Sequence, residues 1–323
     1  MNFWKNKKVL VTGGCGMMGS HATEFLVEAG ARVRVSDNLS RGSVKFIESV
    51  FDSVEFLKED LLDLAACQKV CKGQEIVMNL AAKVTGIEYN LTHQREMFET
   101  NFLLQRNVIH AAAEAGVKRF LQVSTACIYP HDALTPTPES EGLRGTPEPT
   151  NEGYGWAKRM GEKLAEYYTK ETAMECIIVR PFNAYGPRDN FSESESHVIP
   201  ALISRILRGD DPVEIWGSGN QKRVFVHARD IAKGMILLTE KAPPAEPVNV
   251  GHRKMVSIKE LFETICRVLK KSPKPHYDTT KPEGYPARAA DDTKLKALTG
   301  FVPSISLEEG IREMVSWLES HPT

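Results

Sequence analysis

The sequence predicts an α/β fold, a doubly wound parallel sheet with a smaller, interleaved C-terminal domain. Two observations lead to this class. Short β-branched runs alternate with longer stretches that carry apolar residues at helical spacing, which is the rhythm of successive βαβ units. The short runs are almost continuously apolar, as at Val9–Val11 and Ile76–Met78, and this indicates strands covered by helices on both faces.

The elements are predicted in order along the chain. Strands are expected at Lys8–Thr12, Arg32–Val35, Val54–Leu57, Glu75–Asn79, Arg119–Ser124 and Cys176–Arg180. Apolar residues three or four positions apart predict helices between them, at Gly16–Ala29, Leu61–Cys71, His93–Ala115 and Tyr154–Thr172. Gly30, Gly73 and Gly116 stand where such helices end, because glycine readily adopts the left-handed conformation of a helix C-terminus.

Prolines break this regularity after residue 181. A strand at Val248–Val250 and helices at Ala228–Glu240 and Ser257–Leu269 are still predicted. We therefore expect one domain formed by residues 1–182 plus about 227–250, and a smaller one formed by about 183–226 plus 251–323. The proline-rich stretch Pro130–Thr150 is predicted to be a long loop above the sheet, and long loops in such places are usually functional.

Composition bounds the class of protein. The 323 residues, 41% hydrophobic and 26% charged, suffice for about two globular domains and argue against disorder. Lys and Arg total 41 against 42 for Asp and Glu, so neither nucleic acid nor a membrane surface is expected as a partner. The absence of a signal peptide and of a long apolar stretch predicts a cytoplasmic protein. The six cysteines form no CxxC pair, and neither a metal site nor a disulfide framework is expected.

A glycine-rich turn directly follows the first predicted strand and opens the first predicted helix. Gly13, Gly16 and Gly19 permit a tight turn and close backbone approach. A pyrophosphate can then sit on the free N–H groups at the start of the helix, where Met17 and Met18 lie. In this context the pattern predicts a Rossmann dinucleotide site, the alternative being a glycine-rich turn without a ligand.

Asp37, at the end of the second strand, predicts which dinucleotide binds. Its carboxylate is placed to accept from the ribose 2′-OH of NAD and to repel the 2′-phosphate of NADP, so NAD is predicted. Arg41 could instead hold that phosphate, which keeps NADP open. Asp60 would suit the adenine edge, with a plain surface role as the alternative. The residues predicted on these grounds to bind the cofactor are Gly13, Gly16, Met17, Met18, Asp37, Asn38, Asp60 and Leu61.

A tyrosine and a lysine four positions apart lie on one face of a predicted helix, and Thr125 follows the fifth strand of the same sheet. The Lys158 ammonium is expected to lower the pKa of the Tyr154 phenol. The phenolate could then take a sugar hydroxyl proton while hydride leaves for a nicotinamide, with the hydroxyl of Thr125 orienting the sugar. The three residues predict a hydride-transfer site.

Together with the glycine pattern, these residues resemble the extended short-chain dehydrogenase/reductase family over nearly the whole chain. Further agreement is found at Asn79–Ala82, Asn101, Arg180–Pro187 and Arg223–Asp230. The resemblance implies that the cofactor is also bound by Ala81, Ala82, Lys83, Tyr154 and Lys158. The resemblance implies that the smaller domain binds a nucleotide sugar, with Asn183, Arg223 and Arg288 near its diphosphate, although each could be a surface or capping residue. It also implies a homodimer, because the helices at His93–Ala115 and Tyr154–Thr172 resemble the pair that forms a four-helix interface in the family.

Ser124–Pro130 resembles the corresponding segment of two subfamilies, the GDP-mannose 3,5-epimerases and the GDP-L-fucose synthases, which use a cysteine at the position of Cys127. In the fucose synthases a histidine matching His197 works opposite that cysteine. The resemblance implies that Cys127 and His197 invert carbons beside a C4 ketone, which needs a base on one face and an acid on the other. A buried structural thiol and a solvated loop imidazole are the alternatives.

These residues together predict an NAD-dependent nucleotide-sugar epimerase. The predicted catalytic residues are Thr125, Tyr154, Lys158, Cys127 and His197, and the predicted substrate-binding residues are Lys83, Asn183, His197, Val198, Trp216, Arg223 and Arg288. Transient C4 oxidation with inversion at C3 and C5 of a GDP-hexose is favoured, a GDP-sugar being preferred to a UDP-sugar. The alternatives are a UDP- or GDP-sugar 4-epimerase, a GDP-4-keto-6-deoxy-sugar epimerase–reductase and, in a different class, a non-catalytic NAD-binding regulator.

Overall fold

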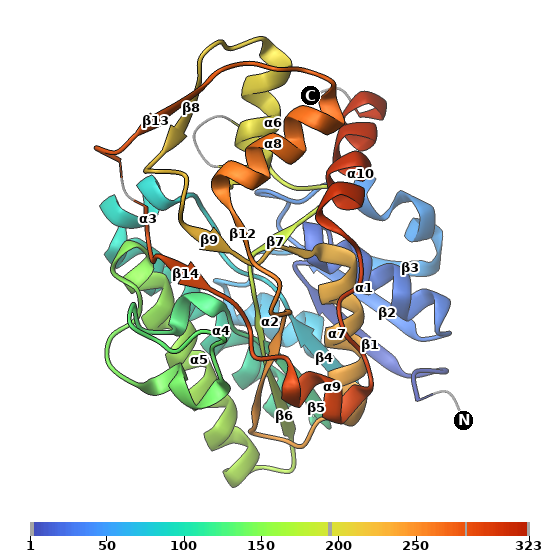
Figure 1. Cartoon of the computed structure of the whole chain (residues 1–323). Coiled ribbons are helices and arrows are strands. Elements are labelled where there is room, and N and C mark those ends of the chain that lie inside the picture. Colours follow the sequence, from blue (N-terminus) through green and yellow to red (C-terminus); the bar gives the residue numbers. More distant parts are fainter. Residues whose placement is uncertain (1–2, 193–195, 282, 322–323) are drawn as a thin grey trace.

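A parallel sheet of seven strands, in the order β11-β6-β5-β4-β1-β2-β3, forms the centre of the computed structural model (Figure 1). The structure describes residues 3–192, 196–281 and 283–321. The strands of this sheet are β1 (Lys8–Thr12), β2 (Arg32–Asp37), β3 (Val54–Lys58), β4 (Ile76–Asn79), β5 (Arg119–Val123), β6 (Glu175–Pro181) and β11 (Pro247–Val250). The order reverses beside β1, and such a switch point opens a crevice at the carboxyl ends of the strands.

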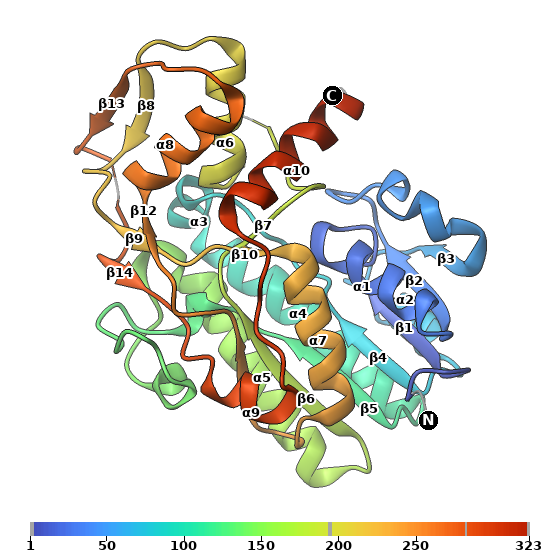
Figure 2. The same ribbon diagram turned by 45° about the vertical axis from the view of Figure 1, so that its right-hand side comes forward.

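Helices cover both faces of this sheet (Figure 2). One face packs against α1 (Met17–Glu28) and α7 (Ala228–Lys241), and the other against α2 (Leu64–Cys71), α4 (Gln94–Glu114) and α5 (Glu152–Glu171). Successive residues of one strand point to opposite faces, so Val9 and Val11 belong to the first core and Leu10 to the second. This arrangement confirms the predicted doubly wound Rossmann class.

A smaller unit with its own apolar core occupies the upper part of Figure 1. Its helices are α6 (Val198–Arg208), α8 (Ile258–Leu269) and α10 (Leu307–Ser320), and its core includes Ile203, Phe225, Leu261 and Met314. Short strands complete it: β7 (Ala184–Tyr185) with β10 (Val226–His227), β8 (Val213–Trp216) with β13 (Pro275–Asp278), and β9 (Lys222–Arg223) between β12 (Val256–Ser257) and β14 (Ala287–Arg288).

The predicted strands of the central sheet are all present, with ends that differ by two residues at most. The sequence did not predict the 3₁₀ segment η1 (Val44–Ser53) or the helices α3 (Ile87–Thr92), α6, α9 (Thr293–Thr299) and α10. In α6 the reason is Pro200, because a proline in a sequence usually indicates a break in a helix. This proline stands in the first turn of α6, where a missing N–H costs no intrahelical hydrogen bond.

Two segments have a position or a conformation that differs from the one predicted from the sequence. The helix α9 packs on α7 and β11, and its Leu295 belongs to the core of the Rossmann face, although it falls in the range assigned to the smaller domain. The stretch Pro130–Thr150 contains two 3₁₀ segments, at Glu139–Leu143 and Pro149–Asn151. Within it the Thr137 N–H donates to the Ala289 carbonyl at 2.8 Å, which ties this stretch to the segment after β14.

Candidate active site

The glycine turn lies between β1 and α1, at the switch point of the sheet. Gly13 has φ +64°, a conformation that favours glycine, and a Cβ there would come within 3.0 Å of the backbone of Ala81 after β4. A Cβ on Gly19 would lie 2.0 Å from the Gly13 carbonyl oxygen. The N-cap residue Gly16 offers no side-chain cap to the helix that begins at Met17, so the first N–H groups of α1 are left for a ligand. The turn fits a dinucleotide pyrophosphate.

Asp37 lies buried at the end of β2 and connects that strand to the glycine turn. Its Oδ2 accepts a hydrogen bond from the Cys15 N–H at 3.0 Å and its Oδ1 one from the Leu39 N–H at 2.8 Å. Burial raises the pKa of this carboxyl, against the effect of the two backbone donors. Asn38, the next residue, is exposed. A carboxyl group beside the glycine turn matches the position predicted for selection against a 2′-phosphate.

The remaining predicted cofactor residues follow β3 and β4. Asp60 accepts a hydrogen bond from the Leu62 N–H at 3.0 Å, and Leu61 is buried. Ala81 donates its N–H to Thr12 at 3.2 Å, and Ala82 and Lys83 are half-buried. The Lys83 Nζ contacts Glu96 and lies 3.3 Å from the Tyr89 hydroxyl, so its ammonium already has partners on the neighbouring helices α3 and α4.

The predicted hydride-transfer residues lie at the junction of β5 and α5. Lys158 is 2% exposed, donates to the Val123 carbonyl at 2.9 Å and has its Nζ 5.6 Å from the centroid of the Tyr154 ring. The Thr125 Oγ1 accepts from the Cys127 N–H at 3.2 Å, which leaves the hydroxyl hydrogen of Thr125 available to donate. The structure brings these residues together because α5 packs against β5 and against the segment that directly follows it.

The electrostatics of Tyr154 differ from the expectation. Burial raises the pKa of this phenol, and the neighbouring Cys127 raises it further, whereas Lys158 was expected to lower it. The main reason is the burial of the phenol itself. Burial also lowers the pKa of Lys158, to about 8, and the Lys158 Nζ donates to the Val123 carbonyl. In this form of the protein, Tyr154 is therefore a protonated phenol.

Cys127 lies half-buried on a short 3₁₀ segment (Ala126–Ile128) after β5. Burial raises the pKa of its thiol to about 11; the Thr125 hydroxyl, Arg288 and Lys158 oppose this change, and Glu148 adds to it. At neutral pH the resting group is therefore a thiol. The three charged groups that act on the sulfur, Glu148, Arg288 and Lys158, come from three separate segments of the chain, so Cys127 faces the same site as Lys158.

Two residues of this cluster were missed by the sequence analysis. Glu148 is 2% exposed and accepts a hydrogen bond from the Asn151 side chain at 2.9 Å. Tyr285 is buried, and burial, Glu148 and Cys127 all raise the pKa of its phenol. Both residues stand in irregular segments, where no periodicity marks them. A lone acidic residue between two prolines was the single local signal for Glu148.

Arg223 and Arg288 meet around Tyr285. The guanidinium carbon of Arg288 lies 3.9 Å from the centroid of the Tyr285 ring, and that of Arg223 lies 4.6 Å from it. Arg223 donates to the carbonyls of Glu283 and Tyr285, and burial lowers its pKa. Arg288 is 1% exposed and donates to the Pro130 carbonyl at 2.7 Å. Its Nε and Nη1 are buried and have no hydrogen-bond partner among the described residues.

The other predicted substrate residues lie on the smaller unit. The Asn183 side chain donates to the Val224 carbonyl at 2.8 Å, directly beside Arg223. Trp216 ends β8 and donates its indole N–H to Glu214 at 2.8 Å. His197 is the N-cap residue of α6 and Val198 the first residue of that helix. Among the described residues, no hydrogen bond or ion pair joins His197 to Cys127, and the ionisable partner of His197 is Asp189.

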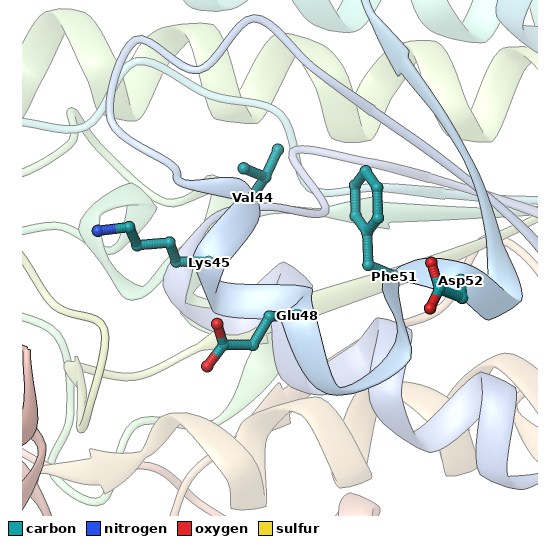
Figure 3. Close-up of a pocket in the computed structure, with 5 residues that line it drawn as sticks. All are labelled: Val44, Lys45, Glu48, Phe51 and Asp52. Carbon is teal, nitrogen blue, oxygen red and sulfur yellow. The ribbon is translucent and has the colours of Figure 1, made fainter.

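Other features do not compete with this site. A shallow hollow on η1 is lined by Val44, Lys45, Glu48, Phe51 and Asp52 and contains no predicted site residue (Figure 3). In residues 3–192, 196–281 and 283–321 no three His, Cys, Asp or Glu side chains gather as metal ligands. Over the same residues no helix is long and apolar enough to cross a membrane.

A Rossmann sheet with a glycine turn at its switch point and a tyrosine–lysine pair beside β5 defines an NAD-dependent enzyme of the extended short-chain dehydrogenase/reductase class. The chain belongs to the NAD dependent epimerase/dehydratase family, whose model matches residues 9–251. This membership confirms the predicted enzyme class and the predicted cofactor, NAD.

Known relatives cover almost the whole chain. The chain is 35% identical to the GDP-L-fucose synthase of Escherichia coli, over 96% of this chain and 96% of that protein. It is 31% identical to GDP-mannose 3,5-epimerase 1 of Oryza sativa subsp. japonica, over 98% of this chain and 83% of that protein. Its structure is similar to that of UDP-glucose 4-epimerase from Thermotoga maritima, with a TM-score of 0.87 and 28% identity over 97% of this chain and 98% of that one.

Proposed function

We propose that this protein is a nucleotide-sugar epimerase that oxidises C4 of a GDP-hexose transiently, inverts C3 and C5, and returns the same hydride. The observation that supports this proposal most directly is the position of the Cys127 thiol beside the Tyr154–Lys158 pair. Simple 4-epimerisation needs no such thiol, whereas inversion beside a C4 ketone needs an acid and a base. The similarity to a GDP-mannose 3,5-epimerase and a GDP-L-fucose synthase supports the same chemistry.

In the proposed first step, Tyr154 accepts the proton of the C4 hydroxyl while Thr125 donates to the same oxygen. NAD, when bound, supplies the hydride acceptor and a positive charge that favours the phenolate. The buried Lys158 ammonium supports that phenolate from within α5. The ketone then acidifies C3–H and C5–H, and Cys127 and His197 exchange protons with these carbons on opposite faces.

The substrate's diphosphate would lie against Arg223 and Arg288. The Nε and Nη1 nitrogens of Arg288 are buried donors without a hydrogen-bond partner among the described residues, and buried donors are normally paired. An oxygen-rich dianion would satisfy them both. Trp216 and Asn183 are proposed to border the nucleotide and the diphosphate, and the helices α4 and α5 are proposed to form a homodimer interface.

A GDP-4-keto-6-deoxy-sugar epimerase–reductase is the second candidate, favoured by the similarity to fucose synthases. It would need added reduced cofactor, and the carboxyl of Asp37 beside the glycine turn argues for NAD held through a redox-neutral cycle.

The test is an incubation with GDP- and UDP-hexoses in deuterated water without added cofactor, followed by NMR of the products. We expect deuterium at C3 and C5 of a GDP-hexose, and a fall of roughly 10²–10⁴-fold in its incorporation for Cys127→Ser. Cys266→Ser, on the far helix α8, is the matched control and should behave as the wild type. Epimerisation at C4 alone without deuterium in the product would contradict the proposal.

A further inference from the structure

Asp189 is a buried carboxylate outside the cluster described above. It lies between β7 and α6, and its side chain is 3% exposed. Its Oδ1 accepts a hydrogen bond from the Asn190 N–H at 2.7 Å, whereas its Oδ2 is buried and has no partner among the described residues. Burying a carboxylate oxygen without a hydrogen-bond partner costs free energy, so the buried position of Asp189 calls for a functional explanation.

The group that faces Asp189 is the His197 imidazole. The Nδ1 of His197 lies 3.6 Å from the Asp189 Oδ1, and this nitrogen is buried and makes no hydrogen bond in the described residues, although the side chain as a whole is 40% exposed. The ring therefore turns Nδ1 inward. A distance of 3.6 Å is longer than a hydrogen bond, and catalytic hydrogen bonds are often long until substrate binds. The imidazole does not cap α6 either, because the N-cap makes no side-chain hydrogen bond.

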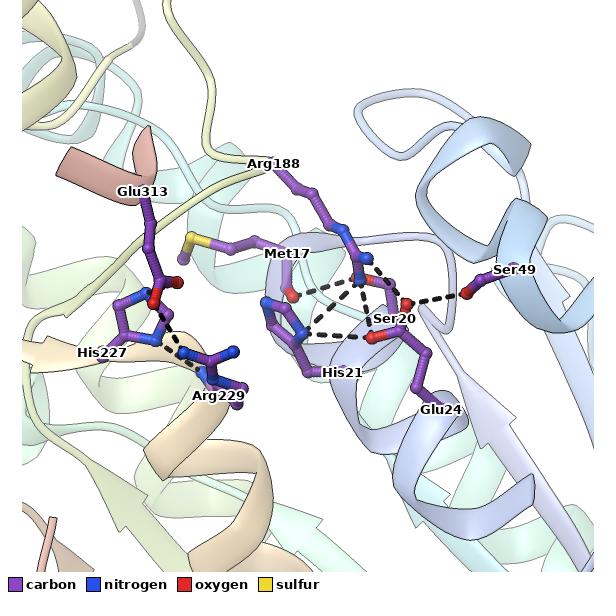
Figure 4. A network of polar contacts seen from close by, with 9 residues as sticks. All are labelled: Met17, Ser20, His21, Glu24, Ser49, Arg188, His227, Arg229 and Glu313. Carbon is purple, nitrogen blue, oxygen red and sulfur yellow. Dashed lines mark hydrogen bonds and ion pairs between the residues drawn. The ribbon is translucent and has the colours of Figure 1, made fainter. Parts of the chain in front are cut away.

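The turn that carries Asp189 is held firmly against the cofactor helix. Arg188 has φ +72°, an unusual conformation for a residue with a side chain. Its guanidinium contacts both carboxylate oxygens of Glu24, at 2.7 and 3.1 Å, and donates to the Ser20 hydroxyl at 3.0 Å, both residues belonging to α1 (Figure 4). Strained backbone that is kept by such contacts is typical of functional segments. The anchor fixes the residue directly before Asp189.

We propose that Asp189 is the positioning residue of His197. Its carboxylate accepts the Nδ1–H of the imidazole and so keeps the tautomer whose Nε2 carries the lone pair. When Nε2 takes a proton from the carbon beside the ketone, Asp189 is the counter-ion of the resulting imidazolium; the proton leaves again from Nε2 to complete the cycle. The catalytic use of His197 rests on the function proposed above, whereas the Asp189–His197 pairing does not.

The test reads the tautomer directly. In the NAD-bound protein labelled with ¹⁵N-histidine, NMR spectra at pH 8 should show His197 with a protonated Nδ1 and an unprotonated Nε2, the signals being assigned by their loss in His197→Gln. Asp189→Asn and Asp189→Ser should both shift His197 toward the Nε2–H form. Asp210→Asn, which removes a carboxylate just beyond the other end of α6, is the matched control and should leave the His197 signals unchanged.

Turnover gives the second readout. Asp189→Asn should lower kcat for deuterium incorporation by up to the roughly 10²–10⁴-fold that a general acid or base contributes, with KM and C4 oxidation nearly unchanged. A His197 that carries its proton on Nε2 in the wild type, or a tautomer unaffected by both Asp189 variants, would overturn the pairing. If the tautomer is as expected but no GDP-hexose takes up deuterium, the proposed function fails and the pairing stands.

Discussion

The candidate site has two sides that are built in opposite ways. On the sheet side, Thr125, Cys127 and Lys158 stand at the end of β5 and on α5, and Lys158 is 2% exposed. On the loop side, His197 stands at the start of α6 with a side chain that is 40% exposed, and Asp189 is its ionisable neighbour within the part of the chain that the structure describes. The residues of the sheet side are held in place by regular elements, through backbone hydrogen bonds and packing. The position of His197 on the loop side depends instead on a few side-chain contacts.

This difference indicates which step of the proposed reaction each side of the site can catalyse. Hydride transfer tolerates little displacement of the reacting groups, so its residues are expected on the rigid sheet side. Proton exchange at C3 and C5, the two carbons that flank C4, needs a group that can adjust to both positions, which a partly exposed imidazole can do. The following four changes test this division, from the largest expected effect to the smallest.

Tyr154→Phe should abolish the oxidation of C4 that is assigned to the sheet side. Without the phenolic oxygen no group takes the C4 hydroxyl proton, so the C4 ketone does not form and both epimerisation and deuterium uptake fall by at least the roughly 10²–10⁴-fold of a lost general base. Product NMR measures this loss. Tyr167→Phe, half-exposed on the same helix, is the control and should keep full activity. Persistent deuterium uptake in Tyr154→Phe would show that the two sides do not divide the reaction as described.

Glu162→Gln should show how firmly the sheet side is supported. Glu162 and Arg180 form a buried pair, each 2% exposed, with two hydrogen bonds of 2.9 and 2.7 Å. Removing one charge leaves the other buried and unpaired, so the free energy of unfolding should fall by about 3–5 kcal/mol in urea titrations. The partly exposed pair of Lys163 and Glu166 on the same helix provides the control. Glu166→Gln should cost about 1 kcal/mol or less, and equal costs for the two variants would contradict the expected rigidity.

Asp37→Ala tests whether the glycine turn that is proposed to bind the cofactor is positioned as firmly as the residues of the sheet side. Because Asp37 stands beside the glycine turn, its loss should relax the preference for NAD over NADP by roughly 10-fold, or about 1.4 kcal/mol of relative binding. Kd values of both nucleotides, measured by calorimetry on protein stripped of cofactor, give the ratio. Asp60→Ala should weaken both nucleotides alike. A preference for NADP in the wild type would refute the assignment of Asp37.

Glu148→Gln should have the smallest effect of the four variants, a change in the pKa of the Cys127 thiol. Glu148 contributes to raising the pKa of this thiol to about 11, so its neutralisation should lower that pKa and increase the thiolate fraction at a given pH. One pKa unit is a tenfold change in thiolate, and we expect alkylation by iodoacetamide at pH 8 to accelerate by up to roughly 10-fold. Mass spectrometry of the peptides follows Cys127, with Cys266 as an internal reference whose rate should not change.

Much of the fold could be predicted from the sequence because its signals are local. Apolar runs of strand length, helical periodicity and glycines at turns placed β1 through β6 within two residues and the main covering helices within three. The same local signals marked Gly13, Tyr154 and Lys158, since their spacing is read on a single turn or a single helix face. In the smaller unit the signals were sufficient for α8 but not for α6. At α6 they failed because a proline in a first helical turn looks, in the sequence, like a proline that ends a helix.

The sequence by itself determined the sheet, the dinucleotide turn and the pair of residues on α5, since each follows from neighbours a few positions apart. Only the tertiary structure decided the surroundings of Cys127, where Glu148, Tyr285 and Arg288 converge from segments without periodicity. It also decided that the pKa of Tyr154 rises and that Asp189 faces His197. Burial and the charges of distant residues set these properties, and neither is a function of spacing along the chain.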